Sequence, residues 1–184
     1  MSEYQIIRFC APTLAGLKTA SLFCCDAPDE AELLGQLRHW NTSLAPKGLR
    51  MLPLRIWNGR ALIYLYRPKA LARDLACEDA ACLLNGSGYD GTEPSGCLRC
   101  LMDRLQCQKD GFPHEIGLFL GYPPEDVRGF IENETRNYKF TGYWKVYGDE
   151  AYARAAFAKY KKCTDIYCRS WRSGASLEAL TVAG

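Results

Sequence analysis

Two kinds of segment are missing from this sequence of 184 residues: a long apolar run and an export leader. A transmembrane helix needs about 20 consecutive apolar residues, and no run approaches that length. The first residues, MSEYQIIRFCAPTL, have neither a basic start followed by an apolar core nor a small-residue cleavage site. We therefore expect a cytoplasmic protein with no membrane partner.

An excess of charge of one sign is also lacking. The 23 Lys and Arg residues nearly balance the 21 Asp and Glu residues, which leaves a net charge of +2. Proteins dedicated to nucleic acids or anionic membranes usually carry a clear positive excess. Any basic surface must therefore be local.

The last part of the chain predicts a long helix, from about Glu150 to Ser173, with two contrasting sides. Mostly aromatic residues recur at helical spacing along one side: Tyr152, Ala156, Tyr160, Cys163, Tyr167 and Trp171. Basic residues lie roughly opposite: Arg154, Lys161, Lys162, Arg169 and Arg172. This pattern is typical of a helix with one side in the core and the other in solvent, and the basic side is where we would expect an acidic protein partner.

The first half of the chain alternates strand-like and helix-like segments. Residues 18–25, KTASLFCC, predict a strand, and residues 29–44 predict an amphipathic helix. Asn58-Gly59 predicts a β-hairpin because both residues tolerate positive φ angles. Pro53 moves the first hairpin strand toward a sheet edge, whereas the uninterrupted apolar run at residues 61–66 predicts a strand covered on both faces.

A helix is expected over residues 69–84, and a loop rich in Gly, Ser, Asp and Pro follows at residues 85–96. We predict a single α/β domain over residues 1–184, with α+β as the alternative class. It would contain a small mixed sheet with a β-hairpin, packed by helices, and then a mostly helical half. Any internal division is expected at the loop.

Residues 112–131, FPHEIGLFLGYPPEDVRGFI, have the spacing of a helix-turn-helix, with Gly121 as the turn and Pro124 in the next first turn. The second helix would carry four acidic residues against Arg128 alone, so it would repel DNA. We interpret the segment as a packing corner. DNA binding stays as an alternative because the segment YKFTGYWKVYG could serve as a basic, aromatic wing.

Ten cysteines in a chain without an export signal predict reduced thiols. The segment GCLRCLMDRLQC places Cys97 and Cys100 on one side of a helix with Arg104, whose charge would favour the thiolate. The C-x-x-C spacing is a weak zinc signal, because no second pair repeats it. A metal ion held by Cys97, Cys100 and His114 is one hypothesis, and buried thiols are the other.

His114 and Cys10 are the residues best suited to a reactive site. His114 stands at an expected helix start, where a neutral imidazole can ligate a metal or accept a proton, although a capping or core role is also open. Glu115 beside it suits the field of a helix N-terminus and is also a candidate catalytic residue. Cys10 and Lys18 flank turn residues that could hold a thiol and an ammonium together, as a nucleophilic site requires.

Four segments, in order, are similar to one known family: CAPTLAGLKTASLF, FPHEIGLFLGYPPEDVRGFI, TGYWKVYGD and YKKCT. They resemble the uncharacterised bacterial family called domain of unknown function 3793, found mainly in anaerobic clostridia. The resemblance implies no activity, but it points to positions within these segments. The ligand-binding candidates that it gives are Lys18, Tyr122, Trp144 and Lys145.

These features predict a cytoplasmic accessory protein that binds a small molecule or a metal ion in anaerobic redox or metal metabolism. In this hypothesis Cys10 supplies a thiolate or ligand, Lys18 contacts an anion, and His114 ligates or carries a proton. Two alternatives remain, a winged helix-turn-helix regulator and an enzyme with Cys10 as its nucleophile. The sequence leaves open whether the protein is an enzyme, and nucleic acid is the less expected partner.

Overall fold

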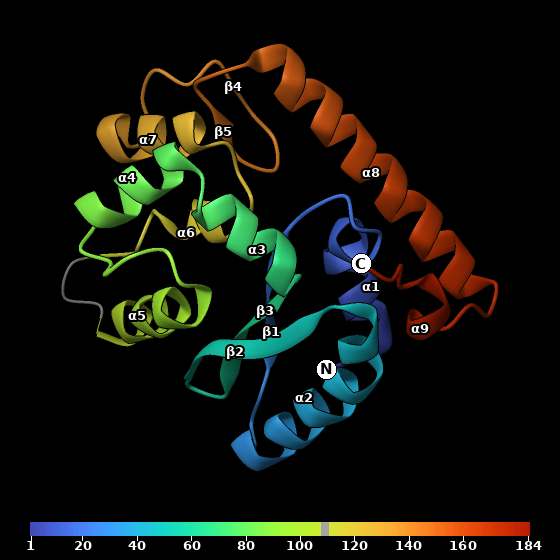
Figure 1. Cartoon of the computed structure of the whole chain (residues 1–184). Helices are drawn as coiled ribbons and strands as arrows, with labels where there is room; N and C mark the ends of the chain where they lie inside the picture. Colours follow the sequence, from blue (N-terminus) through green and yellow to red (C-terminus); the bar gives the residue numbers. More distant parts are fainter. Residues whose placement is uncertain (108–110) are drawn as a thin grey trace. The chain divides into compact units, whose positions relative to one another are not determined.

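The computed structural model describes residues 1–107 and 111–184, in two compact units (Figure 1). One unit combines Met1–Lys69 with Tyr160–Gly184, and the other is Ala70–Lys159. The chain is of the mixed class that the sequence predicts, with small antiparallel sheets packed by helices. The loop predicted at residues 85–96 is shorter in the structure, where it spans residues 87–93 between two helices, and it lies inside the second unit. The C-terminal segment, Tyr160–Gly184, belongs to the first unit because its residues pack on the core of that unit.

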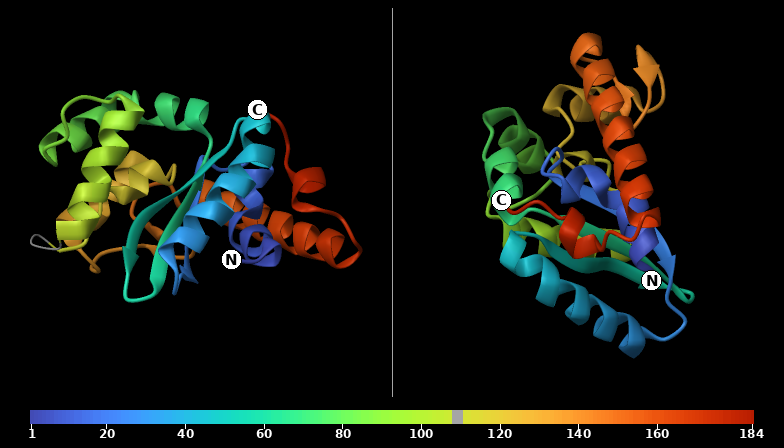
Figure 2. Two further views of the ribbon diagram at one scale, coloured as in Figure 1. Left: turned by 90° about the horizontal axis from the view of Figure 1, so that it is seen from below. Right: turned by 90° about the vertical axis from the view of Figure 1, so that its right-hand side faces the viewer.

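The first unit contains a three-stranded sheet in the order β1-β3-β2. Its strands are β1 (Ala20–Asp26), β2 (Arg50–Trp57) and β3 (Arg60–Tyr66). Both pairings involve β3 and both are antiparallel, so the sheet is antiparallel throughout rather than mixed. The outer strands β1 and β2 run in the same direction, and the helix α2 (Glu30–Leu44) connects them along the sheet (Figure 2).

The hairpin between β2 and β3 has the geometry that its sequence predicts. Asn58 has a φ of 44° and Gly59 a φ of 71°, so both adopt the left-handed conformation of a tight turn. β3 is the central strand, which accounts for its apolar run. β2 is an edge strand, where Pro53 is tolerated, and the register shifts between Pro53 and Arg55.

The core of the first unit lies between the sheet and helices from both ends of the chain. The helix α1 (Glu3–Leu14), which the sequence analysis did not assign, begins with a capping box formed by Ser2 and Gln5. The core joins these buried residues of α1, α2 and the sheet: Ile6, Ile7, Cys10, Leu14, Leu33, Leu37, Phe23, Ile63 and Leu65. Leu177 of α9 (Leu177–Leu180) completes it.

The long helix α8 (Glu150–Arg172) confirms the predicted segment and most of its apolar side. Tyr160 and Cys163 are buried, and Tyr167 and Trp171 pack against the core of the first unit. The prediction for Tyr152 was wrong, because it is 54% exposed while Ala153 is fully buried. At the N-terminal end of α8, the buried side therefore begins at Ala153 rather than at Tyr152. No described helix, α8 included, is long and apolar enough to cross a membrane.

The second unit is mostly helical, as predicted. The expected helix at residues 69–84 is two helices, because Cys77 is extended and acidic residues in the next first turn favour a new N-terminus. A short ribbon of two strands lies between these helices and α8 along the chain. The elements are α3 (Pro68–Leu75), α4 (Glu78–Gly86), α5 (Pro94–Cys107), α6 (Ile116–Phe119), α7 (Pro124–Asn133), β4 (Phe140–Thr141) and β5 (Lys145–Val146).

Candidate functional site

The segment that resembles a helix-turn-helix forms a tight corner between α6 and α7. Gly121 has a φ of 71° and Pro124 is the first residue of α7, as the sequence predicts. At Gly117, an added Cβ would lie 2.7 Å from Cγ2 of Val127, so only glycine allows the two helices to approach this closely. The first helix is a single turn of four residues, which suits a packing corner.

Asp126 ties this corner to the ribbon of β4 and β5. Its buried carboxylate accepts hydrogen bonds from the indole Nε1 of Trp144 at 2.6 Å and from the backbone nitrogens of Tyr147 and Gly148, both at 2.7 Å. One of the four acidic residues that make this segment unsuited to DNA is therefore a structural anchor. Its charge is evident from the sequence, but its hydrogen-bond partners lie 18 to 22 residues further along the chain and follow from no local pattern.

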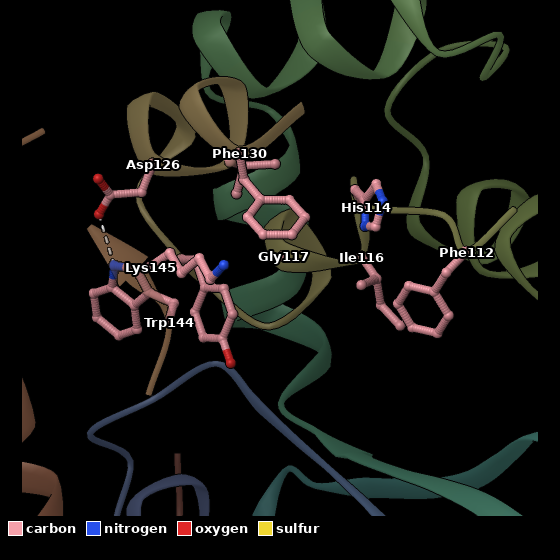
Figure 3. Close-up of a pocket in the computed structure, with 10 residues that line it drawn as sticks. Phe112, His114, Ile116, Gly117, Asp126, Phe130, Trp144 and Lys145 are labelled. Atoms are coloured by element: carbon pink, nitrogen blue, oxygen red, sulfur yellow. Dashed lines mark hydrogen bonds between the residues drawn. The ribbon is translucent and has the colours of Figure 1, made fainter. Parts of the chain in front are cut away.

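A pocket of about 330 Å³ lies between the corner and the ribbon (Figure 3). It is formed by the segment before α6, by α6, by the turn after it, by α7 and by β5 with the residue before it. Its lining residues are Phe112, His114, Ile116, Gly117, Tyr122, Asp126, Val127, Phe130, Trp144 and Lys145. Four of them, His114, Tyr122, Trp144 and Lys145, are candidates from the sequence.

The walls of the pocket are mainly aromatic. Tyr122 stacks on Trp144 with a centroid distance of 4.8 Å and an angle of 30°. The imidazole of His114 meets the ring of Phe130 edge-on at 4.8 Å. Trp144 is buried and held by Asp126, so this wall is fixed before any ligand enters. Phe112 and Phe130 are site residues that the sequence analysis missed, because nothing separates them from core phenylalanines.

Lys145 is the cationic group of the pocket. Its Nζ lies 5.6 Å from the ring centroid of Phe130 and 4.9 Å from that of Tyr138, within the range of cation–π contacts. Among the described residues, no carboxylate forms an ion pair with it. The half-buried ammonium therefore contacts ring faces rather than an acid.

Glu115 is buried in a polar cluster rather than free to act as a base. The hydroxyl of Tyr89 donates to its Oε1 at 2.9 Å, and Nε of Arg104 lies 3.0 Å from the same oxygen. Burial, together with the charge of Glu115, raises the pKa of Tyr89. Glu115 also stands at the N-cap position of α6, where the sequence places it. Through these contacts, Glu115 fixes the start of α6.

Cys97 and Cys100 are both on α5, as predicted, but the expected effect of Arg104 is not seen at Cys97. Burial is the largest influence and raises the pKa of Cys97, whose thiol donates to the carbonyl of Gly91 at 3.4 Å. Arg104 pairs with Glu115 instead. Within residues 1–107 and 111–184, no group of three or more His, Cys, Asp and Glu side chains could hold a metal ion. Ligation by Cys97, Cys100 and His114 stays a prediction.

Cys10 and Lys18 belong to the first unit and influence each other's charge, as their sequence spacing suggests. Cys10 is fully buried, and desolvation raises the pKa of its thiol to about 12 despite the nearby ammonium of Lys18. Desolvation also lowers the pKa of Lys18 to about 8. Cys10 is therefore a protonated thiol at neutral pH, which disfavours a nucleophilic role.

The family comparison covers nearly all of the chain. Residues 6–181 match the model of the family described as "Protein of unknown function (DUF3793)". The chain belongs to this family. Comparisons with curated proteins and with solved structures gave no match. The α6–α7 corner, the ribbon and the pocket all lie within the matched residues, so the pocket is part of the DUF3793 region.

Replacing Asp126 tests whether it anchors the ribbon. Asp126→Ala leaves the indole and two backbone donors without their acceptor, so we expect the free energy of unfolding to fall by roughly 2–4 kcal/mol. Urea titration followed by circular dichroism measures this. Glu132→Ala, an exposed change on the same helix, is the control and should shift the value by less than about 0.5 kcal/mol. Equal effects of the two changes on the free energy of unfolding would contradict the role of Asp126 as an anchor of the ribbon.

The order of cysteine alkylation tests the burial of Cys10. We expect brief treatment with iodoacetamide to modify the exposed thiols first: Cys24, Cys77, Cys82 and Cys107. Cys10 should react last, because it is buried and protonated. Mass spectrometry of peptides at several times gives the order. Preferential labelling of native Cys10 would overturn this expectation and support the nucleophile hypothesis.

Proposed function

We propose that the protein binds a small organic molecule with a flat, apolar body in the pocket between the α6–α7 corner and the ribbon. The observation that carries this proposal is the preformed aromatic wall, in which Tyr122 stacks on a Trp144 that is itself held by Asp126. Ligand pockets are usually concave, mostly apolar and largely preformed, with a few placed polar groups. This pocket has each of these properties.

The size of the pocket supports a small ligand. Its volume of about 330 Å³ is at the lower end of the range of ligand pockets, roughly 300–1,000 Å³. A ring system that enters it would meet Phe130 and His114 on one side and Trp144 on another (Figure 3). Aromatic faces of this kind favour a planar partner that stacks on them or meets them edge-on.

An organic ligand has more support than the other proposals from the sequence. A metal ion would need a cluster of ligands, and the described residues provide none. A DNA-binding regulator would need a second helix free of such negative charge, whereas α7 exposes Glu125 and Glu132 and uses Asp126 internally. An enzyme with Cys10 as nucleophile would need an accessible thiolate, and that thiol is buried.

We further propose that this binding serves an accessory role in anaerobic redox or metal metabolism in the cytoplasm. The state of the cysteines supports a reducing compartment, because all ten are free and several are exposed. Lys18, the other ligand-binding candidate, belongs to the first unit and stays a separate proposal.

Removal of one wall of the pocket tests the proposed function. We expect Phe130→Ala to weaken binding of 2-naphthalenemethanol, a flat neutral probe, by about tenfold, because a buried aromatic contact is lost. Quenching of tryptophan fluorescence on titration with the probe measures the dissociation constant. Tyr152→Ala removes an exposed aromatic ring outside the pocket and is the control, which should bind like the wild type. Loss of binding in both variants, or in neither, would contradict this site.

A further inference from the structure

We propose that the natural ligand is an aromatic carboxylate whose negative charge is held by Lys145. This inference rests on the proposed function, since it names the chemical class that the same pocket takes. It goes further because an apolar pocket alone does not specify a charge. Three features of Lys145 and its surroundings support it. Its backbone is fixed, its ammonium has no acidic partner, and the acid that lines the pocket, Asp126, already accepts hydrogen bonds from other groups.

The backbone around Lys145 is held on both sides. Lys145 is the first residue of β5, and its neighbour Trp144 is fixed by the bond from its indole to Asp126. On the other side, Val146 is fully buried, and the backbone nitrogen of Tyr147 also donates to Asp126. The lysine stem therefore starts from a set position at the pocket rather than from a loose loop.

The ammonium group is directed to the pocket and has its donors available. It lies over the rings of Phe130 and Tyr138, which favour a cation but do not accept its hydrogen bonds as an oxygen does. A lysine ammonium has three N–H donors, and no described residue forms a hydrogen bond or ion pair with them. A ligand carboxylate would supply the missing acceptor and the opposite charge.

The acid that lines the pocket does not compete for Lys145. Asp126 directs its carboxylate to the indole of Trp144 and to two backbone N–H groups, and Figure 3 shows it pointing away from Lys145 and Phe130. Glu115, the other buried acid of the corner, pairs with Arg104. Lys145 thus carries the charge that faces the cavity.

The far side of the pocket adds a second polar position. Figure 3 shows His114, Ile116 and Phe112 on the side of the pocket opposite Trp144 and Lys145. A flat ligand with its carboxylate at Lys145 would therefore extend along the aromatic walls toward the imidazole. This arrangement favours an aryl carboxylate over a short aliphatic acid, which would contact the ammonium without using the rings.

A matched pair of probes tests the charge directly. 2-Naphthoate and 2-naphthalenemethanol share one ring system and differ in the charge of one substituent. We expect the wild type to bind the naphthoate about tenfold more tightly, because a charge-assisted hydrogen bond forms only with the anion. In Lys145→Gln the naphthoate should weaken to the level of the alcohol, whereas the alcohol should change little.

Two further variants control for charge and for folding. Lys145→Arg keeps the cation and should retain most of the preference for naphthoate. Lys159→Gln removes an equal charge from an exposed site on α8, outside the pocket, and should bind both probes like the wild type. Circular dichroism checks that each variant is folded. The same fluorescence titration at low and at physiological salt checks that the preference decreases with ionic strength.

The outcomes separate this inference from the proposed function. Equal binding of both probes to the wild type would overturn the inference and leave the pocket as a neutral-ligand site. An equal loss of both probes in Lys145→Gln would also overturn it, because the lysine would then support the pocket rather than the anion. If neither probe binds the wild type, the proposed function fails together with the inference.

Discussion

The hydrogen bonds to the carboxylate of Asp126 are the interaction on which the second unit's pocket depends. One side chain on α7 accepts hydrogen bonds from an indole and from two backbone N–H groups of the ribbon, and all three donors would lose this acceptor without it. The ribbon has only two residues in each strand, so its own pairing cannot position Trp144. A single buried acid thereby sets both the wall of the pocket and the starting point of Lys145.

A second buried acid fixes the opposite end of the same corner. Glu115 stands at the start of α6 and is bound by Arg104 of α5 and by the hydroxyl of Tyr89. Gly117 then allows α6 and α7 to pack closely. The acidic character that separates this corner from a DNA-reading motif is thus partly structural. The acids are satisfied inside the protein, which leaves a lysine as the charge presented to the cavity.

Local chemistry explains which parts of the fold could be predicted from sequence. The Asn58-Gly59 turn, the edge position of Pro53 and the Gly121 turn were predicted correctly, because each follows from the φ angles or donors of the residues themselves. The antiparallel pairing of β1 with β3 could not be predicted in this way, because it joins strands distant in the chain. The exposure of Tyr152 was missed for the same reason, since packing decides it. The break at Cys77 was missed although the acidic residues after it are a local signal for a new helix start.

In the candidate site, too, the residues indicated by local segments could be predicted, whereas the contacts between distant residues could not. The resemblance of short segments led to His114, Tyr122, Trp144 and Lys145, which the structure brings to one pocket, but it gave no sign of Asp126 as their support.

Cys10 shows why side-chain types and spacing are not sufficient. The sequence correctly suggests that Cys10 and Lys18 are neighbours, and the ammonium does favour the thiolate. Burial acts in the opposite direction and is the larger effect, since it raises the thiol pKa to about 12 and lowers the lysine pKa to about 8. At neutral pH the pair is therefore a thiol beside an ammonium rather than an activated thiolate. Reactivity at such a site depends on the solvent that the fold excludes, and a sequence does not contain that information in any local pattern.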